Sequence, residues 1–421
     1  MSGALLIFED RHWRALRPLT DLTPVPALAF GGSDLAGRWR RQLGAPLLAI
    51  EARAAVLAAW REAPAPEASA RAAAEVLIIN SAALPGAWLE EALAHAAPAL
   101  FMSGGRIAGA RLPIKTVSAA LGSGAEFEPF LEGLGLPGVP VEAHFLSRPW
   151  DFVAGNPGAI TADLEGVPGA VRGEVHPLAA LMEPGRIVIE AGARIEALAV
   201  LDAREGPIRI GPGARVRPHT VVTGPCVVGE RTELLGGFIS RSTFGPQCRV
   251  AGEVEDCVWQ GYANKRHHGF VGHSVIGEWA NLGALTTTSD LKNNYGTVRV
   301  WVDGAEEESG ATKVGAFIGA HVKTGIGTLL PTGAALGVGS NLFGAGRYAP
   351  RSVPSFAWWD GERMVEHRLD AFLATARVAL SRRGRDWLAA EEALLRLTFE
   401  LTAAERGAAP PPRSSRTPRK R

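Results

Sequence analysis

The chain has 421 residues, of which 47% are hydrophobic, so it can bury sizeable cores and is long enough for two or three domains. Its net charge of +1 argues against an overall affinity for nucleic acid. A five-residue apolar run ends at Glu9 and Asp10, which predicts neither a signal peptide nor a membrane span. Three cysteines without metal-ligand spacing indicate a reducing, cytoplasmic compartment.

The first third of the chain alternates between apolar runs and helical stretches. Strands are expected over 4–8, 47–50 and 76–79, and helices over 38–42, 52–61 and 85–96. This alternation predicts an α/β domain over 1–170, with helices on the faces of a parallel sheet. A run rich in Gly and Pro at 155–158 then leads toward the second half.

A six-residue rhythm runs through the second half of the chain. One aliphatic residue or Thr recurs at each sixth position, and the next position is usually small. The recurring residues are Ile210, Val216, Val222, Val228, Leu234, Ile276, Leu282, Ile318, Thr324, Leu330, Leu336 and Leu342. Helices have a period of 3.6 and ordinary strands a period of 2, so neither explains this pattern.

A period of six predicts a hexapeptide-repeat β-helix, in which three hexads form one triangular coil around inward aliphatic side chains. We expect this domain over 185–345. Its left-handed coiling is a property of the repeat class and does not follow from the spacing. Such prisms typically serve acyl transfer or act as rigid scaffolds.

The rhythm breaks over 252–270 and again over 287–311, where we expect loops that carry function. A helical segment is predicted over 355–405. The last stretch, 406–421, is rich in Pro, Ser and Arg and is expected to be a disordered, solvated tail rather than a binding element.

Several motifs resemble one bacterial family. They are NKRHHGFVGHSVIGEWANLGA, LKNNYGTVRVW and FIGAHVKTGIGTLLPTG in the repeat, with LRPLTDLTPV, RPWDFVAGNPGAI and VPSFAWW outside it. The family comprises divergent relatives of the bifunctional N-acetylglucosamine-1-phosphate uridyltransferase/glucosamine-1-phosphate acetyltransferase, the sugar nucleotidyltransferase group. The resemblance implies a nucleotidyltransferase-like α/β domain followed by a left-handed parallel β-helix and C-terminal helices.

The resemblance also implies residue roles for acetyl transfer from acetyl-CoA. His267 falls on the general base, since Phe270 to Gly272 match the step that follows it, and Asn281 on the Asn of the next coil. The Ala positions that border the coenzyme A arm fall on Ala284 and Ala320. A His is suited to accept the ammonium proton because its pKa lies near working pH.

Other polar residues of the repeat are candidates for substrate contacts. Lys265 could bind a sugar phosphate beside His267. The run Lys292, Asn293, Asn294 and Tyr295 is a polar, phosphate-capable cluster or a solvated turn. Lys313 and Lys323 could meet coenzyme A phosphates or remain surface charges. The family's sugar-contacting Asn-Tyr pair falls on 290–291 or on 294–295, because the insertion leaves the alignment open.

The N-terminal domain departs from the better-known enzymes. The Gly-rich loop that cradles a triphosphate is missing after the first strand. Asn80 stands where a metal-binding Asp is usual, and Mg²⁺ prefers carboxylate and phosphate oxygens. The remaining nucleotide-binding candidates are Arg17 as a phosphate clamp, Asp151 as a metal or ribose ligand or a helix cap, and Asn156.

The sequence therefore favours an enzyme of sugar-nucleotide biosynthesis. Its β-helix would acetylate an amino-sugar phosphate, and its N-terminal domain would bind or make a nucleotide sugar, with Mg²⁺ as the candidate metal, at altered activity. Two alternatives stay open: a nucleotidyltransferase whose β-helix only oligomerises, and a non-catalytic scaffold that binds nucleotide sugars. A homotrimer is expected, with a sugar phosphate and a nucleotide as partners and neither nucleic acid nor a membrane span.

Overall fold

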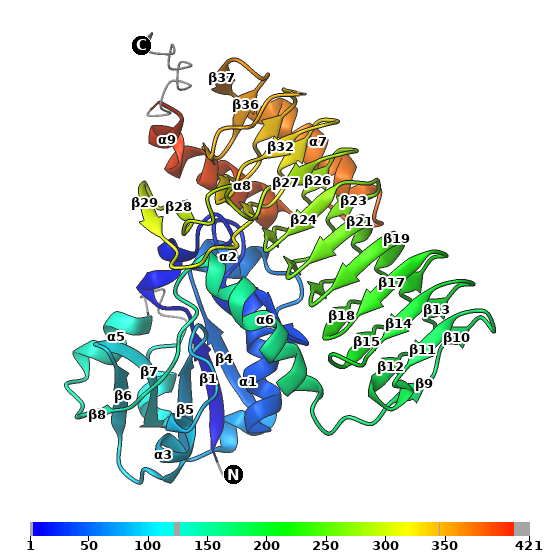
Figure 1. Cartoon of the computed structure of the whole chain (residues 1–421). Helices are drawn as coiled ribbons and strands as arrows, with labels where there is room; N and C mark the ends of the chain where they lie inside the picture. The colour runs from blue at the N-terminus through cyan, green and yellow to red at the C-terminus, as the bar shows by residue number, and fades with distance from the viewer. Residues whose placement is uncertain (1–2, 122–126, 345, 408–421) are drawn as a thin grey trace.

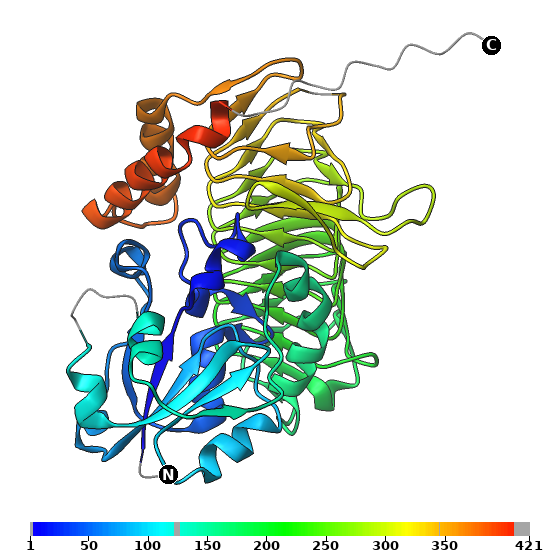
Figure 2. The same ribbon diagram turned by 90° about the vertical axis from the view of Figure 1, so that its left-hand side faces the viewer.

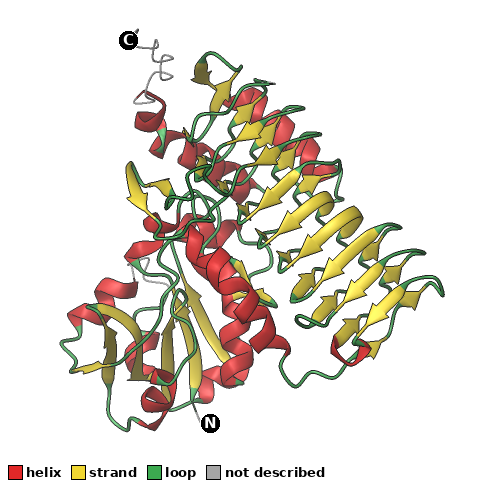
Figure 3. Cartoon of the chain, in the orientation of Figure 1, coloured by secondary structure: helices red, strands yellow, loops and turns green. Residues whose placement is uncertain are grey.

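The structure is a computed structural model that describes residues 3–121, 127–344 and 346–407. An α/β domain, a long parallel β-helix and a C-terminal group of helices follow one another along the chain (Figures 1 and 3). Most of the expected basic tail, from residue 408 on, lies outside the described residues. No helix in the described part of the chain is both long and apolar enough to cross a membrane.

The N-terminal domain is built on a six-stranded sheet in the order β4-β1-β5-β7-β6-β8. Its strands are β1 (Ala4–Phe8), β4 (Leu47–Glu51), β5 (Glu75–Asn80), β6 (Ala99–Ser103), β7 (Arg106–Pro113) and β8 (Gly138–Pro140). β1 is parallel to β4 and β5, as expected, but β7 is antiparallel to both β5 and β6. The sheet is therefore mixed, and the expectation of a wholly parallel sheet was wrong.

Helices and a small hairpin complete this domain. They are α1 (Leu35–Leu43), α2 (Ala54–Ala59), α3 (Trp88–Ala94), α4 (Ile114–Ser118), α5 (Phe127–Gly133) and α6 (Pro149–Leu164), with β2 (Ala29–Phe30) and β3 (Ser33–Asp34). α1 begins because the Asp34 side chain accepts from Gly37 N, and it ends at Gly44, whose φ of 59° suits glycine.

The second half is a left-handed parallel β-helix with three faces; the hexads predict the coils, and the hand is the one expected of the repeat class. The first face comprises β9 (Ala170–Val171), β12 (Ile187–Ile189), β15 (Ile208–Ile210), β18 (Cys226–Val228), β20 (Thr243–Phe244), β22 (Val258–Trp259), β25 (Val275–Ile276), β30 (Ala316–Ile318), β33 (Ala334–Leu336) and β35 (Ser352–Val353). The inward side chains form one continuous core, in which Ile210, Val228 and Ile276 are fully buried.

The second face comprises β10 (Glu174–Val175), β13 (Arg194–Ile195), β16 (Arg215–Val216), β19 (Glu233–Ser240), β21 (Arg249–Glu255), β23 (Asn264–Lys265), β26 (Asn281–Leu282), β31 (Lys323–Thr324), β34 (Asn341–Leu342), β36 (Ala357–Trp359) and β37 (Met364–Glu366). The third face comprises β11 (Ala180–Met182), β14 (Val200–Asp202), β17 (Thr220–Thr223), β24 (Phe270–Gly272), β27 (Thr287–Thr288) and β32 (Leu329–Leu330), and β19 and β21 bend onto it.

One of the two expected breaks is not a break. The coil continues through 252–270, because Trp259, Lys265 and Val271 take up the inward positions there. The second break is real, and it contains a hairpin of β28 (Arg299–Val302) and β29 (Ala305–Glu308).

The C-terminal helices are α7 (Leu369–Ser381), α8 (Ala389–Leu401) and α9 (Ala403–Gly407). They run back along the side of the last coils (Figure 2). A turn at Gly384, with a φ of 65°, interrupts the helical stretch.

The N-terminal domain packs against the first face of the β-helix. α6 lies between the N-terminal sheet and the coils (Figure 1). Phe152 and Val153 of α6 share one apolar cluster with Val258, Val275 and Phe317 of the first face. The domain therefore packs over the middle coils of this face.

Candidate functional site

Outward polar side chains form a ladder on the second face of the β-helix. Successive coils place Arg249, Asn264, Asn281, Lys323 and Asn341 opposite one another in parallel register. Asn264 Nδ2 donates to Asn281 Oδ1 at 2.6 Å. This ladder brings together two predicted site residues, Asn281 and Lys323.

His267 lies at the corner that follows this face. It is exposed, and it lies two residues after Lys265, the last residue of β23, which also carries Asn264. The same turn stacks on the next coil, because Leu285 N donates to the His268 carbonyl at 2.8 Å. An exposed imidazole is open to a substrate, which a general base requires.

Lys265 is placed differently from its prediction. Its side chain occupies an inward hexad position and is fully buried. Nζ donates to the carbonyls of Ala251 (3.2 Å), His267 (2.9 Å) and Gly269 (2.8 Å). An ammonium has three donors, so none is left for a sugar phosphate. Lys265 instead holds the backbone of the turn that presents His267, and burial lowers its pKa to about 8.

The residues expected to border coenzyme A differ in their exposure. Ala320 is 7% exposed and packs in a cluster with Phe372 and Leu395 of the C-terminal helices, so its side chain is covered. The Ala284 carbonyl accepts from Gly327 N at 2.8 Å. Lys323 is half-buried, which lowers its pKa, whereas Lys313 is exposed.

The polar cluster over 292–295 forms a turn before the hairpin. Tyr295 N donates to the Lys292 carbonyl at 2.9 Å, and the Tyr295 side chain is 73% exposed. Lys292 Nζ donates to the Thr297 carbonyl, and Asn294 Oδ1 accepts from Gly296 N at 3.1 Å. Asn293 is exposed. The hydrogen bonds fit the solvated-turn alternative.

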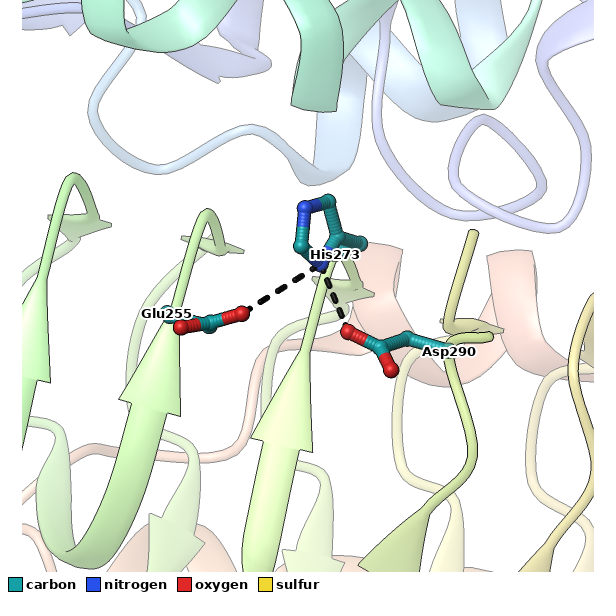
Figure 4. Close-up of side chains that lie close together, drawn as sticks. All are labelled: Glu255, His273 and Asp290. Carbon is teal, nitrogen blue, oxygen red and sulfur yellow. Dashed lines mark hydrogen bonds and ion pairs between the residues drawn. The ribbon is translucent and has the colours of Figure 1, made fainter. Parts of the chain in front are cut away.

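A cluster of charged side chains joins three successive coils at another corner (Figure 4). His273 Nδ1 lies 2.8 Å from Asp290 Oδ2 and 3.9 Å from Glu255 Oε1. Its Nε2 lies 3.4 Å from Asp256 Oδ2. The cluster was not predicted, although a spacing of 17 residues, one coil, separates His273 from Asp290.

The ligand atoms of Glu255, His273 and Asp290 lie within 4.8 Å of one another, which is close enough for a metal ion. Two cations already face the carboxylates. Lys313 Nζ is 3.6 Å from Glu255 Oε1, and Arg241 forms a 2.6 Å ion pair with Asp256. We interpret the cluster as an ion-pair network that joins the coils rather than as a metal site. The pKa of Asp290 lies below its usual value despite burial, because His273 donates to it.

The carboxyl ends of β1 and β5 in the N-terminal domain do not fit Mg²⁺. Asn80 is fully buried, with Nδ2 donating to Asp10 Oδ2 at 2.7 Å and to the Ile107 carbonyl at 2.9 Å. Arg106 contacts both Asp10 oxygens, at 2.5 and 3.1 Å. A guanidinium therefore neutralises the carboxylate that a divalent cation would need. Sequence reasoning missed Arg106, which no local motif marks.

The other three nucleotide-binding candidates have structural partners. Arg17 pairs with carboxylates, at 2.6 Å to Asp21 Oδ1 and 2.7 Å to Glu405 Oε1. Asp151 Oδ2 accepts from Ser147 N at 2.7 Å and from Arg148 N at 2.9 Å, so it caps α6. This geometry corresponds to the helix-cap alternative that was predicted for Asp151.

Asn156 lies at the interface between the domains. It is fully buried, and its Oδ1 accepts from Gly31 N at 2.9 Å and from Thr243 Oγ1 of the β-helix at 3.0 Å. It joins α6, the β2–β3 turn and the first face. A nucleotide would have to displace this packing to reach it.

Comparison with known proteins agrees with this architecture. Residues 5–169 match the family described as sugar nucleotidyl transferase. The N-terminal domain is nucleotidyltransferase-like. A bifunctional sugar-1-phosphate nucleotidylyltransferase/acetyltransferase of Sulfurisphaera tokodaii is 30% identical over 162 residues, 38% of this chain and 35% of that protein. The bifunctional protein GlmU of Methanococcus vannielii is 27% identical over 245 residues, 56% of this chain and 52% of that protein.

The chain thus spans about a third to a half of the length of these curated relatives. Among solved structures, a UDP-N-acetylglucosamine acyltransferase from Campylobacter jejuni aligns with 55% of this chain and 83% of its own, at 16% identity. Its TM-score is 0.19.

Proposed function

We propose that this protein is a transferase of sugar-nucleotide biosynthesis whose β-helix transfers an acetyl group from acetyl-CoA to the amine of an amino-sugar phosphate. One observation carries the proposal. A single chain joins a domain that matches the sugar nucleotidyl transferase family to a hexapeptide β-helix with an exposed histidine beside an amide ladder. The partial matches to bifunctional nucleotidyltransferase/acetyltransferases support the same pairing.

The proposed chemistry uses His267 and the ladder. His267 would take the proton from the substrate ammonium, and the free amine would attack the thioester carbonyl. The tetrahedral oxyanion then needs a hydrogen-bond donor, which an Asn281 amide can supply. Collapse of that intermediate breaks the carbon–sulfur bond and expels the coenzyme A thiolate, which takes the second proton from the attacking nitrogen and leaves as the free thiol. The proton held by His267 then passes to solvent. Lys323, one coil further along the ladder, is a candidate contact for coenzyme A phosphates.

We also propose a homotrimer with the His267 corner at a subunit interface. Two apolar side chains are exposed on this corner: Leu285 at 57% and Ile326 at 69%. They share the corner because Leu285 N donates to the His268 carbonyl and Gly327 N to the Ala284 carbonyl. Exposed apolar groups in a row mark an interaction surface. A strictly monomeric mass in sedimentation velocity at micromolar concentration would refute the trimer.

The nucleotidyltransferase half is proposed to bind a nucleotide sugar with weak or altered synthetic activity. The contacts of Asp10 support this view. Its carboxylate, at the end of β1, already accepts hydrogen bonds from Asn80 and Arg106 rather than facing a metal ion. This observation also favours a second candidate for this half, a sensor that binds nucleotide sugars without making them.

One experiment tests both halves together. The full chain would be incubated with acetyl-CoA and a panel of amino-sugar phosphates while free thiol is measured. In parallel, pyrophosphate release would be measured with UTP or dTTP, Mg²⁺ and sugar 1-phosphates. We expect amine-dependent thiol release and little pyrophosphate. Thiol release that no amine stimulates would refute acetyl transfer, and brisk pyrophosphate release would refute the weak nucleotidyltransferase.

A further inference from the structure

The three parts of the chain meet at one corner of the β-helix, which we call the junction. Glu278 and Trp279 form the turn between β25 and β26 there, and α8 lies against α2 of the N-terminal domain. Glu278 faces two cavities of about 60 and 70 Å³, and residues of all three parts line both of them. The junction and the His267 corner lie at opposite ends of the second-face strands.

Two arginine–glutamate pairs hold the junction closed. Arg61, which follows α2, contacts both carboxylate oxygens of Glu391 on α8, each at 2.5 Å. Arg385, in the turn before α8, contacts Glu62 at 2.5 Å and also the Tyr262 hydroxyl of the coils. These contacts tie the C-terminal helices to the N-terminal domain, and each guanidinium already has its carboxylate.

Glu278 adds a third carboxyl group to the junction without a further cation. Among the described residues, no side chain forms a hydrogen bond or an ion pair with this carboxyl. The equivalent turn positions of the adjacent coils are small, Gly261 and Ala320, and Ala320 packs in an apolar cluster with Leu395 of α8. An ionised Glu278 would therefore place an unpaired charge beside apolar side chains, which is unfavourable.

The repeat contains the same turn outside the junction. Glu230 follows β18 and a glycine, as Glu278 follows β25 and a glycine. Glu230, however, is 52% exposed at its side chain and pairs with Arg231 at 3.0 Å. The two glutamates occupy equivalent turns and differ in burial and in partner, so the C-terminal helices account for the unusual setting of Glu278.

We propose that Glu278 makes the junction sensitive to pH, because its neutral carboxyl lets α8 pack against the N-terminal domain and its ionisation loosens that contact. Burial, together with repulsion from Glu62 and Glu391, raises the pKa of Glu278 to about 8, and Arg61 offsets this only in part. In an open junction the pKa would return to its ordinary value of 4.5. The closed junction binds more protons between these two values, so opening becomes more favourable as the pH rises from 4.5 to 8.

His321 of the next coil faces one of the same cavities and titrates in the opposite sense. Burial lowers its pKa to about 3 from an ordinary value of 6.5, so the closed junction holds it neutral. An open junction would let His321 take up a proton below pH 6.5, which favours opening as the pH falls. The remaining charges that face Glu278 belong to the two arginine–glutamate pairs. The window from pH 6.5 to 8.5 therefore reports mainly on Glu278.

Hydrogen–deuterium exchange of the full chain at pH 6.5 and 8.5, corrected for the intrinsic rate at each pH, tests the proposal. In the wild type, exchange of α8 should be about tenfold faster at pH 8.5 than at pH 6.5, since opening follows the proton balance of Glu278. Glu278→Gln cannot ionise and should abolish this acceleration. Glu278→Ala, which also lacks the carboxyl, should behave in the same way. Glu230→Gln is the matched control and should accelerate as the wild type does.

Melting temperatures at the same two pH values give a second measurement. At pH 8.5, Glu278→Gln should melt at a higher temperature than the wild type, whereas Glu230→Gln should not. The proposal is overturned if α8 exchanges equally at both pH values in the wild type. It is also overturned if the acceleration persists in both Glu278 variants, or if Glu230→Gln abolishes it as well. None of these readouts depends on acetyl transfer, so they test the junction independently of the proposed function.

Discussion

At the scale of single residues, His267 separates the proposed mechanism from the alternatives. His267→Ala should lower acetyl transfer by about 10²–10⁴-fold, because a positioned general base contributes that much. His268→Ala is the matched control. His268 is also exposed, but the family pattern places the base on its neighbour, His267. Steady-state thiol release would measure both. A larger loss for His268→Ala would mean that the residue correspondence is displaced by one position.

Lys265 is the residue that sequence reasoning misplaced, and the reason is physical. Its neighbours follow the hexad rhythm, but a lysine at an inward position looks like a break in a pattern of aliphatic residues. The side chain is accepted there because the core offers three carbonyl oxygens to the ammonium. The six-residue period predicts which positions face inward. It does not predict that the carbonyl groups of one turn will accept hydrogen bonds from a buried lysine.

Lys265→Met should destabilise the fold at pH 7 by about 1–3 kcal/mol, since the carbonyls of the turn lose their donor. Lys313→Met, at a side chain that is 51% exposed, should change stability by less than about 0.5 kcal/mol. Urea denaturation at pH 7 would measure both differences. Equal stability of the two variants would show that the Lys265 hydrogen bonds contribute nothing net.

Lys265 should also give the wild type a characteristic pH dependence. Burial lowers its pKa to about 8 in the folded chain, from 10.5. Between these values the unfolded chain binds more protons, so this group makes the fold more stable as pH rises. The wild type should therefore gain stability relative to Lys265→Met between pH 8 and 10.5, by up to about 3 kcal/mol. A difference that stays constant over that window in urea denaturation would contradict the lowered pKa.

At the scale of elements, the sequence predicts regular segments well and their connections less well. Strands β1, β4 and β5 and the hexad coils follow from local patterns of apolar residues. The antiparallel strand β7 does not, because pairing direction depends on a partner that is distant in sequence. The helical stretch near the C-terminus was expected as one segment, and Gly384 divides it into α7 and α8.

Asp151 tests whether α6 is a structural or a ligand-binding element. Asp151→Ala should destabilise the protein by about 1 kcal/mol, because two backbone N–H groups at the start of α6 lose their acceptor. Glu165→Ala, exposed at the other end of α6, is the control and should have little effect. Thermal unfolding would measure both. A loss of nucleotide binding without a loss of stability would instead support the ligand role for Asp151.

At the scale of the whole molecule, the β-helix has its own core but does not stand free. Its interior cluster contains residues of the coils alone. The first face, however, shares a second cluster with α6, in which Val258, Val275 and Phe317 are fully buried. Asn156 and Thr243 add a buried hydrogen bond across the same interface. The repeat can be located from the sequence, whereas this interface cannot. The sequence shows which side chains of each domain are apolar, but not that these two apolar surfaces pack against each other.

A chain that begins at Ala170 tests this view of the interface. It should keep the coils, since their interior cluster is complete without the N-terminal domain. It should also expose the apolar side chains of the first face, and exposed patches of this kind promote association. We therefore expect a β-rich far-UV circular dichroism spectrum, a lower melting temperature than the full chain, and increased binding of an apolar dye. Loss of the β-rich spectrum would show that the coils depend on the N-terminal domain to fold. An unchanged melting temperature without dye binding would show that the shared cluster contributes little, and that the two domains are joined mainly by the chain itself.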